Sequence, residues 1–411
     1  MIFSSRRFSW LYFSLIFMAC NNESSRQQQP VDGTATKGSY AYDVEFLKKH
    51  SSGVVELTSE DGKSRVLLSA AYQGRVMTST ASGDSGNSFG WLNYDLIAAP
   101  EKRKQFNPVG GEERFWMGPE GGQYSLYFKA GDSFNISHWQ VPALIDTLPY
   151  DITQAGRSQA VFSKKASLVN YSGADFDIEI ERKISLLDEK QIETKLTSPI
   201  PAGVMFVAFE TENNVRNAGS KDWSADKGLL SIWLLGMYTP SPKTVVIIPF
   251  HGQADARSLI TDNYFGEIPT SRLEVKDSIL FFTCDGKYRS KIGLSPLIAK
   301  PVAGSFDFER NVLTIVLPQV DKGASYVNSK WEMQKEPYKG DVINSYNDGP
   351  LADGTQMGPF YEIESSSPAL QLKKGQTGVY RQTTCHFQGD YSSLKQIAQH
   401  LLGVNLDEIK K

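Results

Sequence analysis

Apolar residues at every second position constrain the fold of this chain more than any other feature. In the segment DFDIEIER (175–182), apolar and acidic side chains alternate, as in a strand with one buried and one wet face. Longer apolar runs suit strands buried on both faces, and Gly, Asp, Asn and Pro separate them. Roughly 18 to 22 strands predict an all-β fold, a large antiparallel β-sandwich, and no fixed-period repeat points to a propeller. The other alternating runs are 64–69, 74–80, 124–129 and 191–197, and the apolar runs are 204–209, 229–238, 244–250, 279–284 and 311–318.

Helix is expected in only two places. Residues 42–50 suit two turns, and a C-terminal helix is predicted over 392–402. Ser393 with Gln396 would cap the second helix and Gly403 would stop it. Its apolar face would pack on the outside of the sandwich. That face consists of Leu394, Ile397, Ala398, Leu401 and Leu402.

The N-terminal residues are interpreted as a signal peptide (1–19) and a lipidated tether (20–42). Arg6 and Arg7 precede an apolar run over 8–19, which has the length of a signal peptide and is too short to span a membrane. Cys20 follows Ala19 in the pattern of an acylated bacterial lipoprotein, and the alternative is an ordinary secretory signal. The tether is polar and cannot bury a core, so a single domain over 43–411 is expected. These features predict a lipid-anchored protein of the bacterial cell envelope, periplasmic or on the cell surface.

Charge and missing motifs exclude several functions. The 43 Lys and Arg against 46 Asp and Glu give a net charge of −3, which is not the basic field of a nucleic-acid binder. No GxGxxG follows a strand, and neither GxxxxGK[ST] nor GxSxG occurs, so nucleotide binding and serine hydrolase chemistry are not expected. Cys284 and Cys385 lack CxxC spacing, which leaves a disulfide and two separate buried thiols equally open.

The segment GGEERFWMGPEGGQ (110–123) sets carboxylates, a guanidinium and an indole between two glycine pairs. Charged groups hydrogen-bond hydroxyls, an indole stacks on the apolar face of a sugar, and glycines let the backbone approach a ligand closely. The segment therefore predicts a site for a neutral polyol, with a polar loop around a structural Trp as the alternative. Its candidate contacts are Glu113, Arg114, Trp116, Glu120 and Gln123.

Two of the 5 histidines bear on this hypothesis. His138 lies beside Trp139 in a polar loop after the glycine-rich segment, a combination that fits a sugar site. His386 lies in the last expected strand, where a structural hydrogen bond is expected instead.

Polar side chains gather again in the segments 209–223 and 338–369. The first contains Asn214 and is interpreted as a long functional loop or a sheet crossover. In the second, Asn347 and Asp348 are compatible with a glycan site, with oxygen ligands for Ca²⁺ or with Asx turns.

Glu362 and Glu364 are two residues apart in a predicted strand, so both side chains point to the same face. Two carboxylates on one face repel unless the face is wet or a cation lies nearby. They are therefore either a pair for acid/base chemistry or part of a solvated strand face.

The order of these segments resembles the galactose mutarotase-like superfamily and its aldose 1-epimerases. The glycine-rich segment after the first strands and GPFYEIESSSPALQLKKGQTGVYRQTTCHF (358–387) carry the resemblance, which covers roughly residues 45 to 390. Uncharacterised secreted lipoproteins of carbohydrate-degrading bacteria look similar throughout.

The resemblance implies that superfamily's large antiparallel supersandwich and proton transfer at a sugar's anomeric centre, with a carboxylate as base and a His as acid. Glu362 corresponds to the base, with Glu364 as its register alternative. Glu113 and Glu120 stand where the family's first His is expected, and no His-Pro-Tyr motif occurs midway.

We therefore expect a carbohydrate-active or carbohydrate-binding envelope lipoprotein with a saccharide ligand. An enzyme would be an epimerase-like isomerase or a glycan hydrolase or lyase, and Glu362 with His138 or Glu120 would supply two groups with separated pKa values. The alternatives are a non-catalytic glycan-binding lipoprotein and a structural envelope protein. No cofactor is expected, and Ca²⁺ among Glu120, Glu362 and Asp348 is left open.

Overall fold

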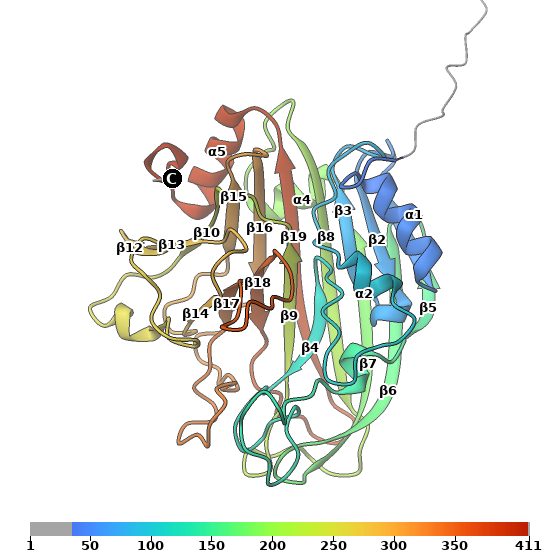
Figure 1. Cartoon of the computed structure of the whole chain (residues 1–411), viewed down its shortest axis with the longest axis vertical. Coiled ribbons are helices and arrows are strands. Elements are labelled where there is room, and N and C mark those ends of the chain that lie inside the picture. Colours follow the sequence, from blue (N-terminus) through green and yellow to red (C-terminus); the bar gives the residue numbers. More distant parts are fainter. Residues whose placement is uncertain (1–34, 410–411) are drawn as a thin grey trace, which may run out of the picture. The chain divides into compact units, whose positions relative to one another are not determined.

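The computed structural model describes residues 35–409, which form three antiparallel β-sheets (Figure 1). The largest sheet has ten strands in the order β12-β13-β10-β15-β16-β19-β8-β7-β6-β5. The second has six, in the order β11-β14-β17-β18-β9-β4, and β1, β2 and β3 form the third. This part of the chain is therefore the large antiparallel β-sandwich that the sequence predicts.

The elements have the following bounds. The three-stranded sheet contains β1 (Val54–Thr58), β2 (Arg65–Ser69) and β3 (Arg75–Thr80). The six-stranded sheet contains β4 (Arg114–Gly118), β9 (Ser231–Tyr238), β11 (Ile260–Thr261), β14 (Ser290–Leu294), β17 (Ile343–Asn347) and β18 (Tyr361–Ser366). The ten-stranded sheet contains β5 (Asp151–Ala155), β6 (Gln159–Val169), β7 (Asp175–Leu186), β8 (Met205–Asn217), β10 (Thr244–Pro249), β12 (Leu273–Lys276), β13 (Ile279–Thr283), β15 (Ala303–Asp307), β16 (Val312–Pro318) and β19 (Thr377–Gln388). The helices are α1 (Tyr40–His50), α2 (Tyr94–Ala98), α3 (Ala143–Asp146), α4 (Glu189–Leu196) and α5 (Tyr391–Leu402), with 3-10 turns η1 (Ala70–Tyr72), η2 (Ala256–Leu259) and η3 (Leu406–Glu408).

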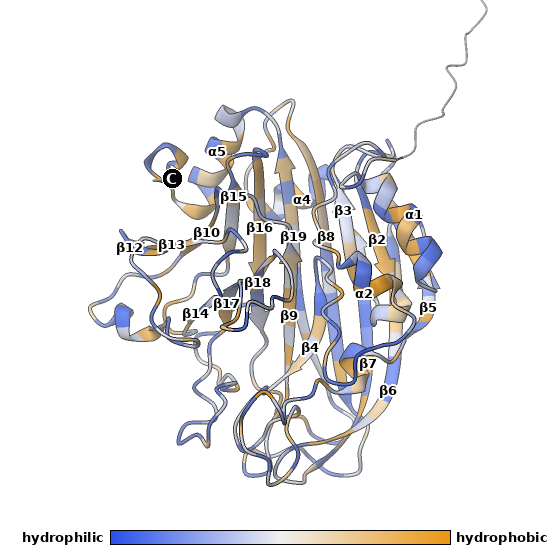
Figure 2. Ribbon diagram, viewed as in Figure 1, coloured by the Kyte–Doolittle hydropathy of each residue, from blue (hydrophilic) through white to orange (hydrophobic). Residues whose placement is uncertain are grey.

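The main core lies between the ten-stranded sheet and the two smaller sheets. Strand β7 shows how the alternating pattern builds it: Phe176, Ile178 and Ile180 are buried, whereas Asp177 on the opposite face is exposed. Apolar residues colour most of β16 in the middle of the sheet (Figure 2). The period-two pattern therefore predicted β7 because one of its faces is buried, whereas the continuous apolar run predicted β16, which is buried on both faces.

Different elements cover the outer faces of the three sheets. Helices α4 and α5 pack on the ten-stranded sheet, and α1 and α2 pack on the three-stranded sheet. Loop residues, among them Trp139 and Phe360, pack against the outer face of the six-stranded sheet. Because loops carry fewer constraints than packed helices, this face is the one free to bear a site.

The prediction of a strand at 191–197 is wrong, because these residues belong to helix α4. Asp188 and Gln191 form a capping box, and Ile192 and Leu196, four residues apart, are the buried positions. This short segment fits both the strand period of about 2 residues and the helix period of about 3.6 residues. The capping box is the signal that favours the helix.

Two further segments differ from their predictions. Residues 124–129 form turns instead of a strand, with Tyr127 buried and its hydroxyl donating to the Met117 carbonyl at 2.9 Å. Residues 209–223 are not a loop throughout, since β8 runs on to Asn217 with alternating burial. Polar side chains along β8 lie on a sheet face, so the sequence of this strand lacks the alternation of apolar and polar residues that indicates a strand.

The first and the last α-helix of the described fold both begin earlier in the sequence than predicted. Helix α1 starts at Tyr40, which is fully buried, so residues 40–42 belong to the folded chain and not to a tether. Helix α5 starts at Tyr391, and Asp390, not Ser393, caps it by accepting a hydrogen bond from the Ser393 backbone N–H. Gly403 ends the helix with a φ of 69°, as predicted.

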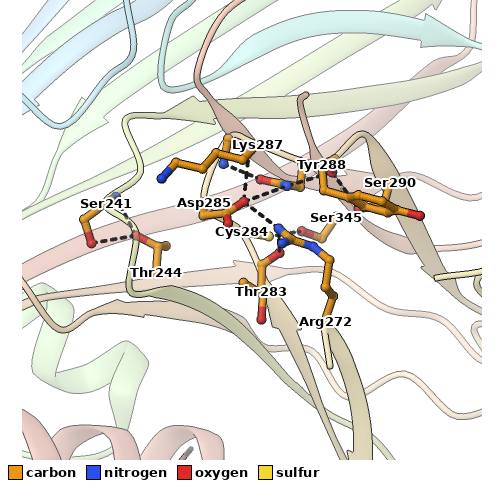
Figure 3. Close-up of polar contacts among 12 residues, drawn as sticks. Ser241, Thr244, Arg272, Thr283, Cys284, Asp285, Lys287, Tyr288, Ser290 and Ser345 are labelled. Atoms are coloured by element: carbon orange, nitrogen blue, oxygen red, sulfur yellow. Dashed lines mark hydrogen bonds and ion pairs between the residues drawn. The ribbon is translucent and has the colours of Figure 1, made fainter. Parts of the chain in front are cut away.

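The two cysteines of the described chain are free and buried, so the disulfide alternative is wrong. The Sγ atom of Cys284 lies 4.0 Å from the Ser345 hydroxyl (Figure 3). The predicted signal peptide and Cys20 lie outside the described residues, and within 35–409 no helix is long and apolar enough to cross a membrane.

Candidate functional site

The outer face of the six-stranded sheet gathers a cluster of charged and indole side chains. Its antiparallel register places Trp116 opposite Trp233, and Leu235 between Arg114 and Glu364. Because side chains alternate along a strand, these positions share one face. This cluster, called the carboxylate cluster below, comprises Arg114 and Trp116 on β4, Trp233 on β9, Lys291 on β14, Glu362 and Glu364 on β18, and Glu120 after β4.

Arg114 forms a buried ion pair with Glu362. Its Nη2 donates to Oε1 of Glu362 at 2.5 Å, and the two side chains are 3% and 7% exposed. The guanidinium also lies over the Trp116 ring, 4.7 Å from its centroid. An ion pair this far from water needs further hydrogen bonds to offset the cost of removing both charges from solvent.

Glu364 accepts two hydrogen bonds on the same face, one from a charged donor and one from a neutral donor. Lys291 Nζ lies 2.9 Å from its Oε2, and Trp233 Nε1 donates to the same oxygen at 3.0 Å. The Lys291 side chain is 13% exposed, which makes it the cluster's link to the solvent. The prediction that Glu362 and Glu364 share a face is confirmed, and the solvated-face alternative is wrong because both residues are buried.

The carboxyl group of Glu362 has a raised pKa. Burial, together with the neighbouring Glu364, raises the pKa of Glu362 to about 8, although Arg114 and Lys291 pull it down. The two carboxyl groups lie on the same sheet face, two residues apart on β18. Glu362 can therefore both give and take a proton near neutral pH.

Glu120 adds a third carboxyl group to the cluster. Its Oε1 accepts a hydrogen bond from Trp139 Nε1 at 3.0 Å. Burial raises the pKa of Glu120, Lys291 lowers it and Glu364 raises it. Burial alone would lower the pKa of Lys291, but Glu364 and Glu120 outweigh it and raise that pKa. Lys291 therefore stays an ammonium ion.

Aromatic rings lie beside the carboxylate cluster. Trp116 meets Trp233 edge to face, with centroids 5.5 Å apart and planes at 77°. Trp139 stacks on Trp331, with centroids 5.9 Å apart and planes at 25°. Indole rings beside carboxyl groups offer both the apolar surface and the acceptors that a sugar ring requires.

Four buried polar atoms of the cluster have no hydrogen-bond partner within the described chain: Nε and Nη1 of Arg114, Nε1 of Trp116 and Oε1 of Glu364. An unpaired buried polar group costs about 1–3 kcal/mol, so their gathering calls for a ligand or water. Three of them donate and one accepts, which suits hydroxyl groups, because a hydroxyl does both.

The raised pKa of Glu362 predicts a pH-dependent stability. A carboxyl group whose pKa rises from 4.5 to about 8 on folding stabilises the protein fully below pH 4.5, and this contribution is lost as the pH rises through 8. We expect the wild type to lose more stability between pH 5 and pH 8.5 than a Glu362→Gln variant, measured by urea unfolding at both pH values. Equal losses in the two proteins would show that Glu362 ionises normally.

Glu113, a predicted ligand contact, is instead part of the core. Its Oε1 accepts from Arg182 at 2.7 Å, and both side chains are fully buried. Thr211 and Gln382 donate to its other oxygen at 3.0 and 3.1 Å. With these partners Glu113 joins the two facing sheets and has no place in the carboxylate cluster.

The two glycine pairs approach protein and not a ligand. A Cβ on Gly110 would lie 2.0 Å from the Trp91 carbonyl oxygen, and one on Gly121 would lie 2.3 Å from that of Lys330. Gln123 exchanges two hydrogen bonds with the backbone of Gln334, at 2.9 and 3.0 Å. The second glycine pair and Gln123 therefore hold the segment that carries Trp331 over the cluster.

The structure does not bring His138 or Asn214 into the cluster. His138 is exposed, and its Nδ1 contacts the Ser133 hydroxyl at 3.0 Å. Asn214 lies on the outer face of β8, where its amide contacts Glu181 at 3.3 Å. Instead of a histidine, Glu362 has Arg114, Glu364 and Lys291 as its neighbours.

Asn347 and Asp348 hold turns together. Asn347 Nδ2 donates to the carbonyl of Tyr288 at 2.8 Å, beside the Arg272–Asp285 ion pair (Figure 3). Asp348 accepts from the Tyr346 hydroxyl at 2.6 Å and from a backbone N–H. Across residues 35–409, no group of three or more His, Cys, Asp or Glu side chains could hold a metal ion.

Sequence reasoning missed Lys291, Trp233 and Trp331. Trp233 lies in the apolar run 229–238, which suggests burial and no role, and Lys291 is a single charge in the strand SKIGL. Only the lateral order β14-β17-β18-β9 brings Lys291 and Trp233 beside Glu364.

The family model described as "Family of unknown function (DUF6786)" matches residues 38–411. The chain belongs to DUF6786. No curated protein matches this DUF6786 chain.

Solved structures similar to the DUF6786 chain include a candidate aldose 1-epimerase from Escherichia coli K12, with 10% identity, a TM-score of 0.47 and coverage of 82% of this chain and 99% of that one. A galactose mutarotase-like protein from Lactobacillus casei has 11% identity, a TM-score of 0.45 and coverage of 82% and 99%. A galactose mutarotase-related enzyme from Lactobacillus acidophilus has 9% identity, a TM-score of 0.46 and coverage of 82% and 98%. These solved structures are similar to the chain at low sequence identity, so the chemistry must be argued from the chain's own residues.

Proposed function

We propose that the carboxylate cluster binds a saccharide and transfers protons at its anomeric centre. One observation carries the proposal: Glu362, whose pKa is raised to about 8, lies beside Glu364 on one sheet face, between Arg114 and Lys291. A carboxyl group with a pKa near neutral pH can both take and give a proton, which opening and closing a sugar ring requires.

Each charged group has a role in this proposal. The ionised member of the glutamate pair accepts the proton of the anomeric hydroxyl. Glu120, whose pKa is raised by burial, protonates the ring oxygen. Lys291 and Arg114 stabilise the negative charge that develops on the anomeric oxygen. The tryptophans bind the apolar face of the ring.

A binding protein without catalysis is the second candidate. It is favoured by the ion pair that occupies Glu362 Oε1, because a carboxylate held by Arg114 is a weaker base. The aromatic rings and the unpaired donors would serve a binder equally well.

An Arg114→Met variant tests the saccharide site. Arg114 supplies two of the unpaired donors, and a hydrogen bond from a charged donor contributes about 1.5–3 kcal/mol, roughly a 10- to 100-fold change in affinity. We expect affinity for sugars to fall by that factor, measured by saturation-transfer NMR titration with a panel of reducing sugars.

The matched control is Arg381→Met, because Arg381 pairs with Glu212 at a half-exposed position of β19. It should bind like the wild type. Unchanged sugar affinity in a folded Arg114→Met protein would refute the assignment of the site.

We also propose, from the sequence alone, that Cys20 anchors the protein by a lipid to the cell envelope. Cells fed a fatty-acid analogue should label the wild type and not a Cys20→Ser variant. Equal labelling of both, or of neither, would contradict the anchor.

A further inference from the structure

Phe265 is an exposed aromatic side chain beside the carboxylate cluster. It lies in the loop between β11 and β12, and its ring is 46% exposed. The preceding residue, Tyr264, donates its hydroxyl to Asp341 at 2.6 Å and lies under Lys291, whose Nζ is 5.6 Å from the ring centroid. These contacts hold the loop beside Lys291, the residue through which the carboxylate cluster reaches the solvent.

The Phe265 ring is held from two sides. The Arg289 guanidinium lies 3.7 Å from its centroid, and Tyr346 packs edge-on, with centroids 6.0 Å apart and planes at 78°. Arg289 in turn donates to the Tyr346 hydroxyl at 3.3 Å, and that hydroxyl donates to Asp348. Despite these two contacts Phe265 remains 46% exposed, so part of the side chain is open to the solvent.

The strand register ties this ring to the cluster. Tyr346 on β17 pairs with Glu362 on β18 and with Lys291 on β14. Phe265 therefore lies one side chain away from both charged residues, on the same sheet face. Scattered exposed apolar residues need no explanation, but a ring pinned beside a site and open to water is pre-organised for stacking.

We infer that Phe265 and Arg289 form a second sugar subsite, so that the ligand is an oligosaccharide and not a free monosaccharide. The inference rests on the proposed function, since it extends that site. The exposed part of Phe265 stacks on the second sugar ring, and guanidinium nitrogens of Arg289 donate to its hydroxyls. Asp348, assigned to turns above, supports the subsite through Tyr346.

The test compares ligand lengths in the wild type and in Phe265→Ala. The probes are glucose, galactose, maltose, cellobiose, lactose, maltotriose and cellotriose, titrated by saturation-transfer NMR. An aromatic stacking contact contributes about 0.5–1.5 kcal/mol, or roughly 2- to 12-fold in affinity. We expect Phe265→Ala to weaken di- and trisaccharide binding by this factor and to leave monosaccharide binding unchanged.

Two further variants serve as controls for this test. Phe265→Trp preserves a stacking ring and should restore oligosaccharide affinity. Leu297→Ala removes an apolar side chain that is 53% exposed, in the turn after β14, and should have no effect.

Three outcomes would overturn the inference. If Phe265→Ala binds all lengths like the wild type, the subsite is refuted while the proposed function stands. If it weakens monosaccharides and oligosaccharides equally, Phe265 belongs to the first sugar's site. If the wild type binds no saccharide of any length, the proposed function fails and the subsite fails with it.

Discussion

Glu362→Gln is expected to slow enzyme-driven exchange between the α and β anomers of a bound sugar by at least about 100-fold, because general acid/base groups contribute roughly 10²- to 10⁴-fold. Glutamine keeps the acceptor for Arg114 but can neither take nor give a proton in the reaction. The fold and the sugar contacts should therefore survive while proton transfer is lost. Exchange NMR on a reducing sugar measures the rate in each protein.

Glu212→Gln is the matched control, because it removes a carboxylate that pairs with Arg381, a residue 44% exposed, and should exchange like the wild type. The wild-type rate should also rise as the pH approaches 8, where the pKa of Glu362 lies, because the ionised carboxylate is the form that accepts the proton of the anomeric hydroxyl. A Glu362→Gln protein with undiminished exchange would remove the glutamate pair from the chemistry.

Arg182→Met is expected to destabilise the folded protein by about 3–5 kcal/mol, the cost of removing one partner from a buried ion pair. Glu113 would keep Thr211 and Gln382 but lose its only ion-pair partner in the described chain. Burial raises the pKa of Glu113, and Arg182 is the main group that lowers it. Urea unfolding followed by tryptophan fluorescence measures the change in free energy.

The double variant Arg182→Met/Glu113→Gln separates charge from packing. With the uncompensated carboxylate removed, we expect it to recover part of the lost stability. A cost below about 1 kcal/mol for Arg182→Met alone would mean that the pair behaves like a surface salt bridge, contrary to its complete burial. A double variant as unstable as the sum of the two single variants would show that the two charges are not coupled.

The sequence predicted most strands because burial of one face leaves a local signature. Ile178 and Ile180 on β7 show it plainly. It fails at 191–197, where Ile192 and Leu196 fit a helix as well as a strand, and at β8, whose polar side chains resemble a loop. Local patterns report which face is buried, and short segments leave the period ambiguous.

The site could be predicted only in part. The spacing of Glu362 and Glu364 places both on one face, and Arg114 and Trp116 follow the same rule on β4. Lys291 could not be found this way. Its partnership with Glu364 depends on the lateral strand order β14-β17-β18, and long-range pairing leaves no mark in a local pattern.

The prediction gave too much weight to His138 because histidines are few. His138 stood out because it is one of 5 histidines and adjoins Trp139. The structure uses the Trp, whose indole donates to Glu120, and leaves the His exposed. Adjacent residues in a loop can point in opposite directions, so proximity in sequence did not imply proximity in the site.

The most direct test of the account is the rate of anomer exchange for reducing sugars with the wild-type protein near pH 7, compared with the spontaneous rate in buffer. The account predicts exchange well above the spontaneous rate for at least one sugar that also shows saturation-transfer contacts. Contacts without any acceleration would contradict the proton-transfer role of Glu362 and Glu364 and leave a saccharide-binding protein.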